Sequence, residues 1–514
     1  MSKPDIDPIS LEIFWTRLIS LVDEAAATLV RASFSTIVRE SNDYAVVLLD
    51  RDAKLLAQSS LSIPSFICTL PATVGHFLEV FPRETLKPGD VLITNDPWMG
   101  TGHLPDINIV VPIFRNGEVV GYAGSVAHAP DIGGRLRSPS NSELFEEGLR
   151  IPRSKLMDAG QENVTLVNIM RDNVRTPDQL MGDIWAQVAA NKTLSQRLLD
   201  MVEETDCDLT AIGVEIHNRA ESAMRSAIRN IPDGSYSYEA KVDGFIEPVT
   251  LRCRIDVRGD EISVDYTGSS SQVRKAINVV PIYTFAYTAY ALKCVLAPDI
   301  PNNDGSFRPI AVSAPFRSIL NPAFPAAVSA RAMTGHLIPT VIMGALAGAL
   351  PGKVRASSSA PLWCVHLSGE NKGQRFTSTF FLNGGQGAGE AGPGLPALSF
   401  PSNLSNTPIE VLEAQAPIKV IRRELRRGTG GRGKHRGGDG QYFEFIVKAD
   451  SPVIVSFMAD RLNTPAPGLN GGEAGATGNV LLDGKPIDPR EIWTVAPGAH
   501  FLLATPGGGG FGQA

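Results

Sequence analysis

The sequence predicts a mixed α+β fold with more than one domain, and three observations support this class. The 514 residues exceed the length that one hydrophobic core usually supports. Stretches with helical and with strand periodicity both occur in the first half of the chain. The C-terminal third is rich in Gly and Pro and has the pattern of short strands and turns. We therefore expect an N-terminal α+β domain over residues 1–235 and a β-rich α+β domain over residues 236–514.

The N-terminal part contains several predicted strands. YAVVLLD (44–50) and KLLAQ (54–58) read as two strands joined by a tight connection, with Asp43 at the entrance of the first. KPGD (87–90) marks a turn before the strand VLIT. That strand leads into NDPWMGTGHLPD (95–106), where two aspartates and a histidine stand among glycines and prolines. Such a polar loop between apolar strands indicates a ligand or a catalytic role.

Helical periodicity marks four stretches. Apolar residues recur at helical spacing over residues 10–31, where they predict an amphipathic helix. Residues 160–230 carry charged faces and apolar stripes, the pattern of packed scaffold helices. Two further helical stretches lie near 282–296 and 336–349. Because the helical pattern gives way to strands near residue 235, we expect a domain boundary there.

Composition narrows the class of function. The net charge of −7 and the pI near 5.7 argue against nucleic acid as a partner. The five cysteines contain no CxxC pair, which indicates a reducing compartment. The first residues, MSKPDIDPIS, lack the apolar segment of a signal peptide, and the apolar run at 337–350 is shorter than the ~18 residues that span a bilayer. We expect a cytoplasmic protein without membrane contact.

A predicted hairpin brings two ligand-type side chains together. The strands INIVVPIF and VVGYAGSVAH flank Asn116-Gly117, a strong signal for a two-residue type I′ turn. The register of such a turn places Asp106 opposite Ala127. His128 then lies within about one residue of Asp106 at the same end of the hairpin.

This hairpin end has the residue types of a metal site. His103 lies three positions before Asp106, across a Pro-containing turn, so both side chains can converge near His128. Two imidazoles with one or two carboxylates are a ligand set that Zn, Mn or Fe prefers. Asp43 can supply a fourth ligand, and Asp131 is close enough in sequence to orient His128. Taken singly, these residues are better explained as turn caps and core histidines, but their convergence favours one divalent transition metal.

Two glycine-rich stretches come close to phosphate-binding motifs. GTGGRGKH (428–435) has His435 where a P-loop needs Ser or Thr, and no helix follows it. The basic residues of 422–436 lack interleaved aromatics, so we expect a solvated or subunit-contacting basic loop. The glycines of TPGGGGFG (505–512) are expected to permit an unusual packed backbone. The absence of a G-x-S-x-G elbow argues against a serine hydrolase.

An ordered set of segments resembles the hydantoinase B family, which includes the B subunits of N-methylhydantoinases and the C-terminal part of 5-oxoprolinase. The segments are DPISLEIFWTRL, VRESNDYAVVLLD, LKPGDVLITNDPWMGTGHLPDINIVVPIF, AHAPDIGG, EEGLRIP, NVRTPDQLMGDIWAQVAAN, SNTPIEVLEAQAPI and TPGGGGFG. The chain departs from the family at Phe66 and Ala129, where histidines are common, and at RGTGG (427–431), where DSGG is common. These differences fit another branch of the family.

The resemblance implies the ATP-dependent opening of a cyclic amide by two different subunits. A separate A-type subunit with an actin-like kinase fold would use ATP to phosphorylate the lactam oxygen, and the B-type subunit would hydrolyse the activated intermediate at a metal centre. The metal ligands carried over from the family are Asp43, His103, Asp106 and His128. Asp96 or Asp131 would act as general base or orienter. No cofactor-binding residues other than the metal ligands are implied for this chain.

Three functions are therefore weighed. The first is the B-type subunit of an ATP-dependent hydrolase for hydantoin, 5-oxoproline or another lactam, in a hetero-oligomer with a hydantoinase A-type ATP-binding subunit. The second is a subunit of an ATP-dependent carboxylase of the acetone carboxylase type, where the metal would orient a phosphorylated intermediate and an enolate. The third is a non-catalytic scaffold for a kinase-like partner, which predicts that His103→Ala leaves activity intact.

Overall fold

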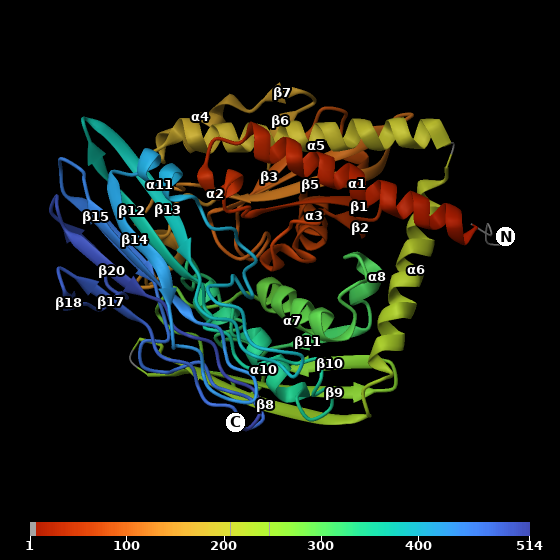
Figure 1. Ribbon diagram of the computed structural model, residues 1–514. Coiled ribbons are helices and arrows are strands. Elements are labelled where there is room, and N and C mark those ends of the chain that lie inside the picture. The colour runs from red at the N-terminus through yellow and green to blue at the C-terminus, as the bar shows by residue number, and fades with distance from the viewer. Residues whose placement is uncertain (1–6, 206, 246) are drawn as a thin grey trace.

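The N-terminal half is built on a seven-stranded antiparallel sheet (Figure 1). The structure is a computed structural model that describes residues 7–205, 207–245 and 247–514, so the start of the N-terminal segment MSKPDIDPIS lies outside the described residues. The strand order is β2-β1-β5-β4-β3-β6-β7, which places the β4–β5 hairpin in the middle of the sheet. The strands are β1 (Tyr44–Asp50), β2 (Leu55–Gln58), β3 (Val91–Thr94), β4 (Asp106–Arg115), β5 (Glu118–His128), β6 (Ser154–Asp158) and β7 (Gln161–Glu162).

Strand β1 explains why both faces of this sheet are covered. Tyr44 and Val46 pack into a hydrophobic cluster with helices α1, α5 and α6, whereas Ala45 and Val47 pack into a second cluster with α3. Successive side chains of a strand point to opposite faces, so a continuous apolar run has to be buried on both sides. Figure 1 shows α1 and α5 lying over one face of the sheet. The helices of this half are α1 (Pro8–Ala32), α2 (Thr36–Arg39), α3 (Thr69–Val80), α4 (Val164–Asp172), α5 (Pro177–Thr205) and α6 (Leu209–Ile228).

The helices predicted from periodicity are confirmed with small shifts. Helix α1 begins at Pro8, because the Asp7 carboxylate accepts a hydrogen bond from the Ser10 N–H at 3.0 Å and proline is tolerated at the first helical position. The region 160–230 contains α4, α5 and α6 as separate helices, and the carboxylate of Asp208 caps the last of them. The described chain contains no helix that is both long and apolar enough to cross a membrane.

A layer of helices and a smaller sheet follow. The sheet has the order β11-β10-β9-β8, and helix α10 packs on β8 and β9. Helix α7 lies between this layer and the N-terminal sheet (Figure 1). The elements are β8 (Gly234–Val242), β9 (Val249–Arg258), β10 (Glu261–Asp265), α7 (Pro281–Leu296), α8 (Asp304–Phe307), β11 (Ile310–Ser313), α9 (Ala332–Gly335) and α10 (Ile338–Leu346). Since one hydrophobic cluster extends across position 235, the boundary expected there stays a prediction.

The C-terminal part is a sandwich of two antiparallel sheets, with orders β13-β12-β16-β19 and β14-β15-β20-β17-β18. Its core contains aromatic residues from both sheets, such as Phe380 against Phe443 and Phe457 against Phe501, with ring centroids 5.3 and 5.6 Å apart. The elements are β12 (Trp363–Asn371), β13 (Gln374–Leu382), α11 (Ile409–Gln415), β14 (Ile418–Arg426), β15 (Gly440–Val447), β16 (Val453–Met458), β17 (Asn479–Leu482), β18 (Lys485–Pro486), β19 (Trp493–Val495) and β20 (His500–Ala504). The mixed α+β fold class is therefore confirmed.

The two glycine-rich motifs pack against each other. The Gly431 N–H donates to the Gly508 carbonyl at 2.9 Å, and His435 and Phe511 exchange backbone hydrogen bonds of 3.0 and 2.9 Å. A Cβ atom added to Gly507 would lie 2.0 Å from the Thr429 carbonyl oxygen, so these backbones approach each other more closely than side chains allow. The packed backbone expected for TPGGGGFG is confirmed. The prediction of a basic loop over residues 422–436 was partly wrong, because residues 418–426 form the edge strand β14.

Candidate metal centre

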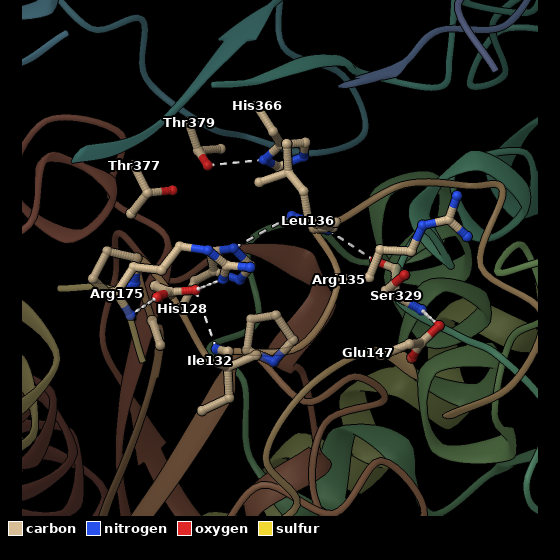
Figure 2. Close-up of a pocket in the computed structure, with 16 residues that line it drawn as sticks. His128, Ile132, Arg135, Leu136, Glu147, Arg175, Ser329, His366, Thr377 and Thr379 are labelled. Carbon is tan, nitrogen blue, oxygen red and sulfur yellow. Dashed lines mark hydrogen bonds and ion pairs between the residues drawn. The ribbon is translucent and has the colours of Figure 1, made fainter. Parts of the chain in front are cut away.

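The β4–β5 hairpin places Asp106 directly opposite His128. The register expected from the sequence, with Asp106 opposite Ala127, was wrong by one residue. Next to the turn the pairing is as expected, with Asn116 and Gly117 both at positive φ, as a type I′ turn requires. A bulge at Val120 then adds one residue to β5 and shifts every later pair. As a result His128 lies closer to Asp106 than expected, and its ring lines a pocket at the hairpin end (Figure 2).

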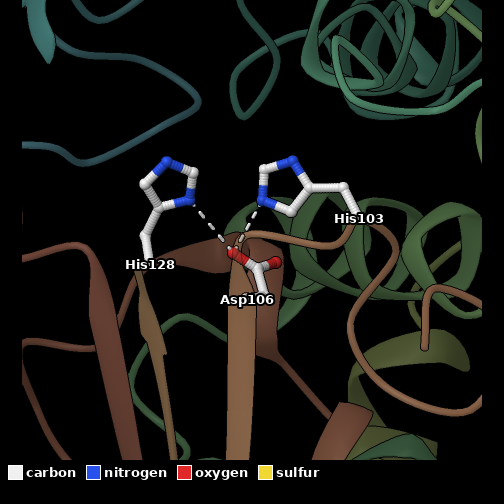
Figure 3. Close-up of side chains that lie close together, drawn as sticks. All are labelled: His103, Asp106 and His128. Atoms are coloured by element: carbon white, nitrogen blue, oxygen red, sulfur yellow. Dashed lines mark hydrogen bonds and ion pairs between the residues drawn. The ribbon is translucent and has the colours of Figure 1, made fainter. Parts of the chain in front are cut away.

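Three predicted ligands form one buried cluster (Figure 3). His103 Nε2 lies 2.7 Å and His128 Nδ1 lies 3.3 Å from the same Asp106 oxygen, Oδ1. The potential ligand atoms of the three residues all lie within 4.8 Å of one another. Two imidazoles and a carboxylate at such separations match the donor set and the spacing of a site for Zn, Mn or Fe.

The contacts of His103 test whether these residues fit a cation. Its Nδ1 lies 3.2 Å from the Ser329 carbonyl oxygen, and its Nε2 faces the Asp106 carboxylate, so both ring nitrogens face acceptors. Burial and the nearby Arg331 guanidinium hold the pKa of His103 well below its usual range, although Asp106 opposes them. A neutral imidazole has only one N–H, so one nitrogen is left facing an oxygen without a proton between them. With the proton on Nδ1, a metal ion at Nε2 removes this conflict, and the residues therefore fit a metal.

The second oxygen of Asp106 is held by two donors. Oδ2 accepts hydrogen bonds from the Thr101 hydroxyl at 2.9 Å and from Arg331 Nη2 at 2.6 Å. The Arg331 guanidinium also lies over the Tyr283 ring, 4.3 Å from its centroid. Burial alone would raise the pKa of Asp106, but the charge of the Arg331 guanidinium holds it well below its usual range. The carboxylate is therefore ionised and its orientation is fixed, as a ligand requires.

Asp43 lies beside this cluster without being part of it. It precedes β1, and its backbone carbonyl accepts a hydrogen bond from the His128 N–H at 3.1 Å. Its side chain lines a cavity of about 30 Å³ together with His103 and Asp106. Burial raises the pKa of Asp43 to about 6, while His128 opposes this shift and Asp106 adds to it. The role of Asp43 as a fourth ligand stays a prediction.

Asp96 and Asp131 are both bound to arginines. Asp96 Oδ1 accepts from the Trp98 N–H at 2.9 Å, and its Oδ2 lies 2.5 Å from Arg150. Asp131 is paired with Arg175 at 2.9 Å. Among the residues that the structure describes, Asp131 makes no hydrogen bond to His128, so the expectation that it orients this histidine directly was wrong. Asp131 nevertheless lines the pocket beside His128, whereas Asp96 lines neither this pocket nor the cavity at Asp43.

Glu147 is a buried carboxyl that the sequence did not single out. It lines the same pocket, and its Oε1 accepts hydrogen bonds from the Val328 and Ser329 N–H groups at 2.8 and 2.9 Å. The Ser329 carbonyl in turn faces His103 and accepts a hydrogen bond from Arg137. Glu147 therefore fixes the backbone that orients both side chains, and no local sequence pattern signals a link across about 180 residues.

Replacing Glu147 by glutamine is expected to flatten the pH dependence of stability. Burial raises the pKa of Glu147 from 4.5 to about 7, so the folded state holds this proton more tightly than the unfolded chain. The stabilisation is fully present below pH 4.5 and is lost as the pH rises through about 7. Between these limits the free energy of unfolding should fall by up to about 3 kcal/mol more in the wild type than in Glu147→Gln.

Chemical denaturation at pH 5 and pH 8 measures this difference. Glu146→Gln is the matched control, since this neighbour is only partly buried and pairs with Arg135 at the surface. An equal loss of stability between the two pH values in wild type and Glu147→Gln would contradict the assignment.

Comparisons with solved structures place this fold in a class. The structure of an ATP-dependent caprolactamase from Pseudomonas jessenii superposes with a TM-score of 0.91 at 26% identity, covering 99% of this chain and 92% of that one. The nucleotide-free structure of acetone carboxylase has a TM-score of 0.88 at 19% identity, covering 99% of this chain and 76% of that one, and shows a shared fold. The whole chain thus has the fold of ATP-dependent enzymes.

Sequence comparison gives the family. The family model described as Hydantoinase B/oxoprolinase matches residues 7–514. A putative B component of a D-/L-hydantoinase from Pseudomonas sp. (strain NS671) is 31% identical over 99% of this chain and 90% of its own length. The 5-oxoprolinase of Dictyostelium discoideum is 29% identical over 99% of this chain but only 40% of its own length. The chain belongs to the hydantoinase B/oxoprolinase family.

Proposed function

We propose that this chain is the B-type subunit of an ATP-dependent cyclic-amide hydrolase, acting on hydantoin, 5-oxoproline or another lactam. The observation that carries the proposal is the buried cluster of His103, Asp106 and His128, in which a neutral imidazole faces two acceptors. The similarity to a hydantoinase B component and to a caprolactamase supports the substrate class. In this proposal a separate A-type subunit uses ATP to phosphorylate the lactam oxygen, and the two subunits form a hetero-oligomer.

In the proposed centre His103, Asp106 and His128 hold one divalent Zn, Mn or Fe ion, with Asp43 as the fourth ligand. Such an ion supplies Lewis-acid chemistry and lowers the pKa of a water molecule toward ~7. The Ser329 carbonyl keeps the His103 proton on Nδ1, so that Nε2 is free to bind. Arg331 and Thr101 hold Asp106 in one orientation, which limits it to a single ligand oxygen.

The acid-base role is proposed for Asp131 rather than for Asp96. Asp131 lines the pocket at His128, where a substrate would approach the cluster, and its partner Arg175 is partly exposed. Asp96 accepts hydrogen bonds from the turn at Trp98 and pairs with Arg150, so its carboxylate fixes the loop that carries His103. A carboxylate in the pocket can accept a proton from attacking water or return it to the leaving nitrogen.

Elemental analysis with activity assays tests this proposal. Purified wild-type protein is expected to hold roughly one transition metal per chain. His103→Ala and His128→Ala should lose the metal and the lactam hydrolysis measured with the A-type subunit and ATP. His217→Ala is a matched control, because His217 is also buried and its ring hydrogen-bonds only to the Leu55 carbonyl, at 2.8 Å, among the described residues.

Three outcomes would change the assignment. Folded wild-type protein that takes up neither Zn, Mn nor Fe would contradict a metal centre. Full activity in metal-free His103→Ala would favour the scaffold role. A carboxylated product from a ketone and bicarbonate, without lactam hydrolysis, would favour the carboxylase alternative.

A further inference from the structure

Arg137 separates two small cavities at the hairpin end. One cavity, of about 30 Å³, is lined by Asp43, His103 and Asp106. The other, of about 40 Å³, is the pocket beside His128 (Figure 2). Arg137 is the one residue that the two linings share. The second cavity has room for a few water molecules or for one small oxyanion.

The charge of Arg137 has no counter-ion, in contrast to the other arginines of both linings. Arg331 pairs with Asp106 at 2.6 Å, Arg175 with Asp131 at 2.9 Å, and Arg135 with Glu146 at 3.5 Å. For Arg137, no carboxylate of the described residues lies within the 4.0 Å of an ion pair. Burial lowers its pKa, and the carboxylates of Asp43 and Asp106, which lie beyond ion-pair distance, oppose this shift only in part. A cation kept in such a place indicates that an anion binds there during function.

The remaining contacts of Arg137 leave part of its guanidinium group without a hydrogen-bond partner. Its Nε donates to the Ser329 carbonyl at 2.8 Å, and its Nη1 lies 3.3 Å from His128 Nε2. Its Nη2 makes no hydrogen bond to any of the described residues. Nη2 is therefore available to a ligand in the neighbouring pocket, and Nη1, with its single 3.3 Å contact, can donate to a second oxygen of the same ligand.

Neutral donors line the other side of the same pocket. Thr377 and Thr379 come from strand β13, and Thr379 Oγ1 lies 2.9 Å from His366 Nδ1 (Figure 2). Of the two acids in the lining, Asp131 is neutralised by Arg175. The other, Glu147, has an Oε2 atom without a hydrogen-bond partner in the described structure. Its protonated form adds a donor to the lining, so the pocket suits an oxyanion best when Glu147 carries its proton.

We propose that Arg137 and the hydroxyls of Thr377 and Thr379 form a subsite for a phosphoryl group next to the metal cluster. The subsite would hold the phosphoryl group of the activated substrate, with the reacting carbon directed toward His103 and Asp106. It would also hold inorganic phosphate after the reaction. This inference deepens the proposed function and rests on it for the identity of the substrate. The phosphoryl chemistry itself follows from the unpaired fork and the hydroxyl donors.

Binding of inorganic phosphate to the purified chain tests the subsite without any assay of catalysis. Isothermal titration calorimetry of wild-type protein should show saturable phosphate binding, weakened by about tenfold or more in Arg137→Met. Arg137→Lys, which keeps the charge but not the fork, should bind with intermediate affinity. Arg171→Met is the matched control and should bind as the wild type does, because Arg171 is exposed, pairs with Asp178 and lines neither cavity. Metal content is measured in each variant, and it should not change.

Two results would overturn the subsite. One is the absence of phosphate binding to folded wild-type protein, and the other is unchanged affinity in both Arg137 variants. A failure of the proposed function would give a different experimental result from a failure of the subsite. If no lactam is hydrolysed with the A-type subunit, yet phosphate binding is lost in Arg137→Met, the subsite stands and the substrate class has to be revised. If a substrate-derived phosphate ester protects the chain from thermal unfolding better than phosphate does, the activated substrate is the main ligand.

Discussion

Asp106→Asn is expected to abolish metal binding and to lower lactam hydrolysis by more than about a thousandfold. The Asp106 carboxylate contacts both histidines through Oδ1 and Arg331 through Oδ2. Asparagine keeps the shape but removes the negative charge, and it can present an N–H where a ligand oxygen is needed. Metal content and turnover with the A-type subunit measure both effects.

The same substitution should also destabilise the protein. It leaves the buried Arg331 without a counter-ion, and breaking such a pair typically costs about 3 kcal/mol. Asp90→Asn is a matched control, since Asp90 is equally buried and pairs with Lys155 at 2.9 Å. It should show a similar loss of stability with no loss of metal. Wild-type metal content in folded Asp106→Asn would contradict the proposed centre.

Local sequence was sufficient to predict the hairpin and most of the cluster. Asn116-Gly117 set the turn, and the short spacing from His103 to Asp106 brought two ligands to the end where His128 arrives. The exact pairing was wrong because of a bulge at Val120. The neighbouring Gly121 is a weak local signal for it, since Gly124 in the same strand is paired regularly. Bulges depend on how neighbouring strands and helices pack, which local spacing does not contain.

The groups that tune the cluster could not be predicted in this way. Arg331 and Ser329 reach the site from the loop before α9, more than 220 residues after His103. Arg137 lies close in sequence to His128, but its missing counter-ion becomes visible only when the whole lining is known. The residue types at a hairpin end thus indicate a metal, whereas the protonation of its ligands and the charge of its pocket depend on tertiary structure.

In the glycine-rich C-terminal part, too, local sequence predicted some features while others depend on tertiary contacts. Sequence context was enough to reject a P-loop at residues 428–435, because no helix follows the glycines. It did not show that this stretch pairs with residues 505–512, which in turn pack against the segment around Gly385. Glycine removes the side chain that would keep such backbones apart, so these residues are determined by contacts between distant segments.

Gly430→Ala is expected to prevent stable folding, and it has the largest stability effect that we predict. The added Cβ would lie 1.8 Å from the Gly437 carbonyl oxygen, which is itself part of a packed backbone and cannot rotate away. The cost should exceed about 3 kcal/mol, the upper end of the usual range for overpacking. Because Gly430 does not have a positive φ, the strain comes from the contact rather than from the backbone conformation of alanine. Soluble yield and thermal unfolding measure the effect.

Gly75→Ala is the matched control for this prediction. Gly75 is exposed within helix α3, and a Cβ there would meet nothing within 4 Å. Alanine is a better helix former than glycine, so this variant should be more stable than the wild type by about 0.5–1 kcal/mol. If Gly430→Ala folded as stably as Gly75→Ala, the close approach of Gly430 to the Gly437 backbone would not be needed for stable folding. The opposite signs of the two effects would show that the effect of a Gly→Ala substitution on stability depends on the distance from the new Cβ atom to the nearest backbone atom.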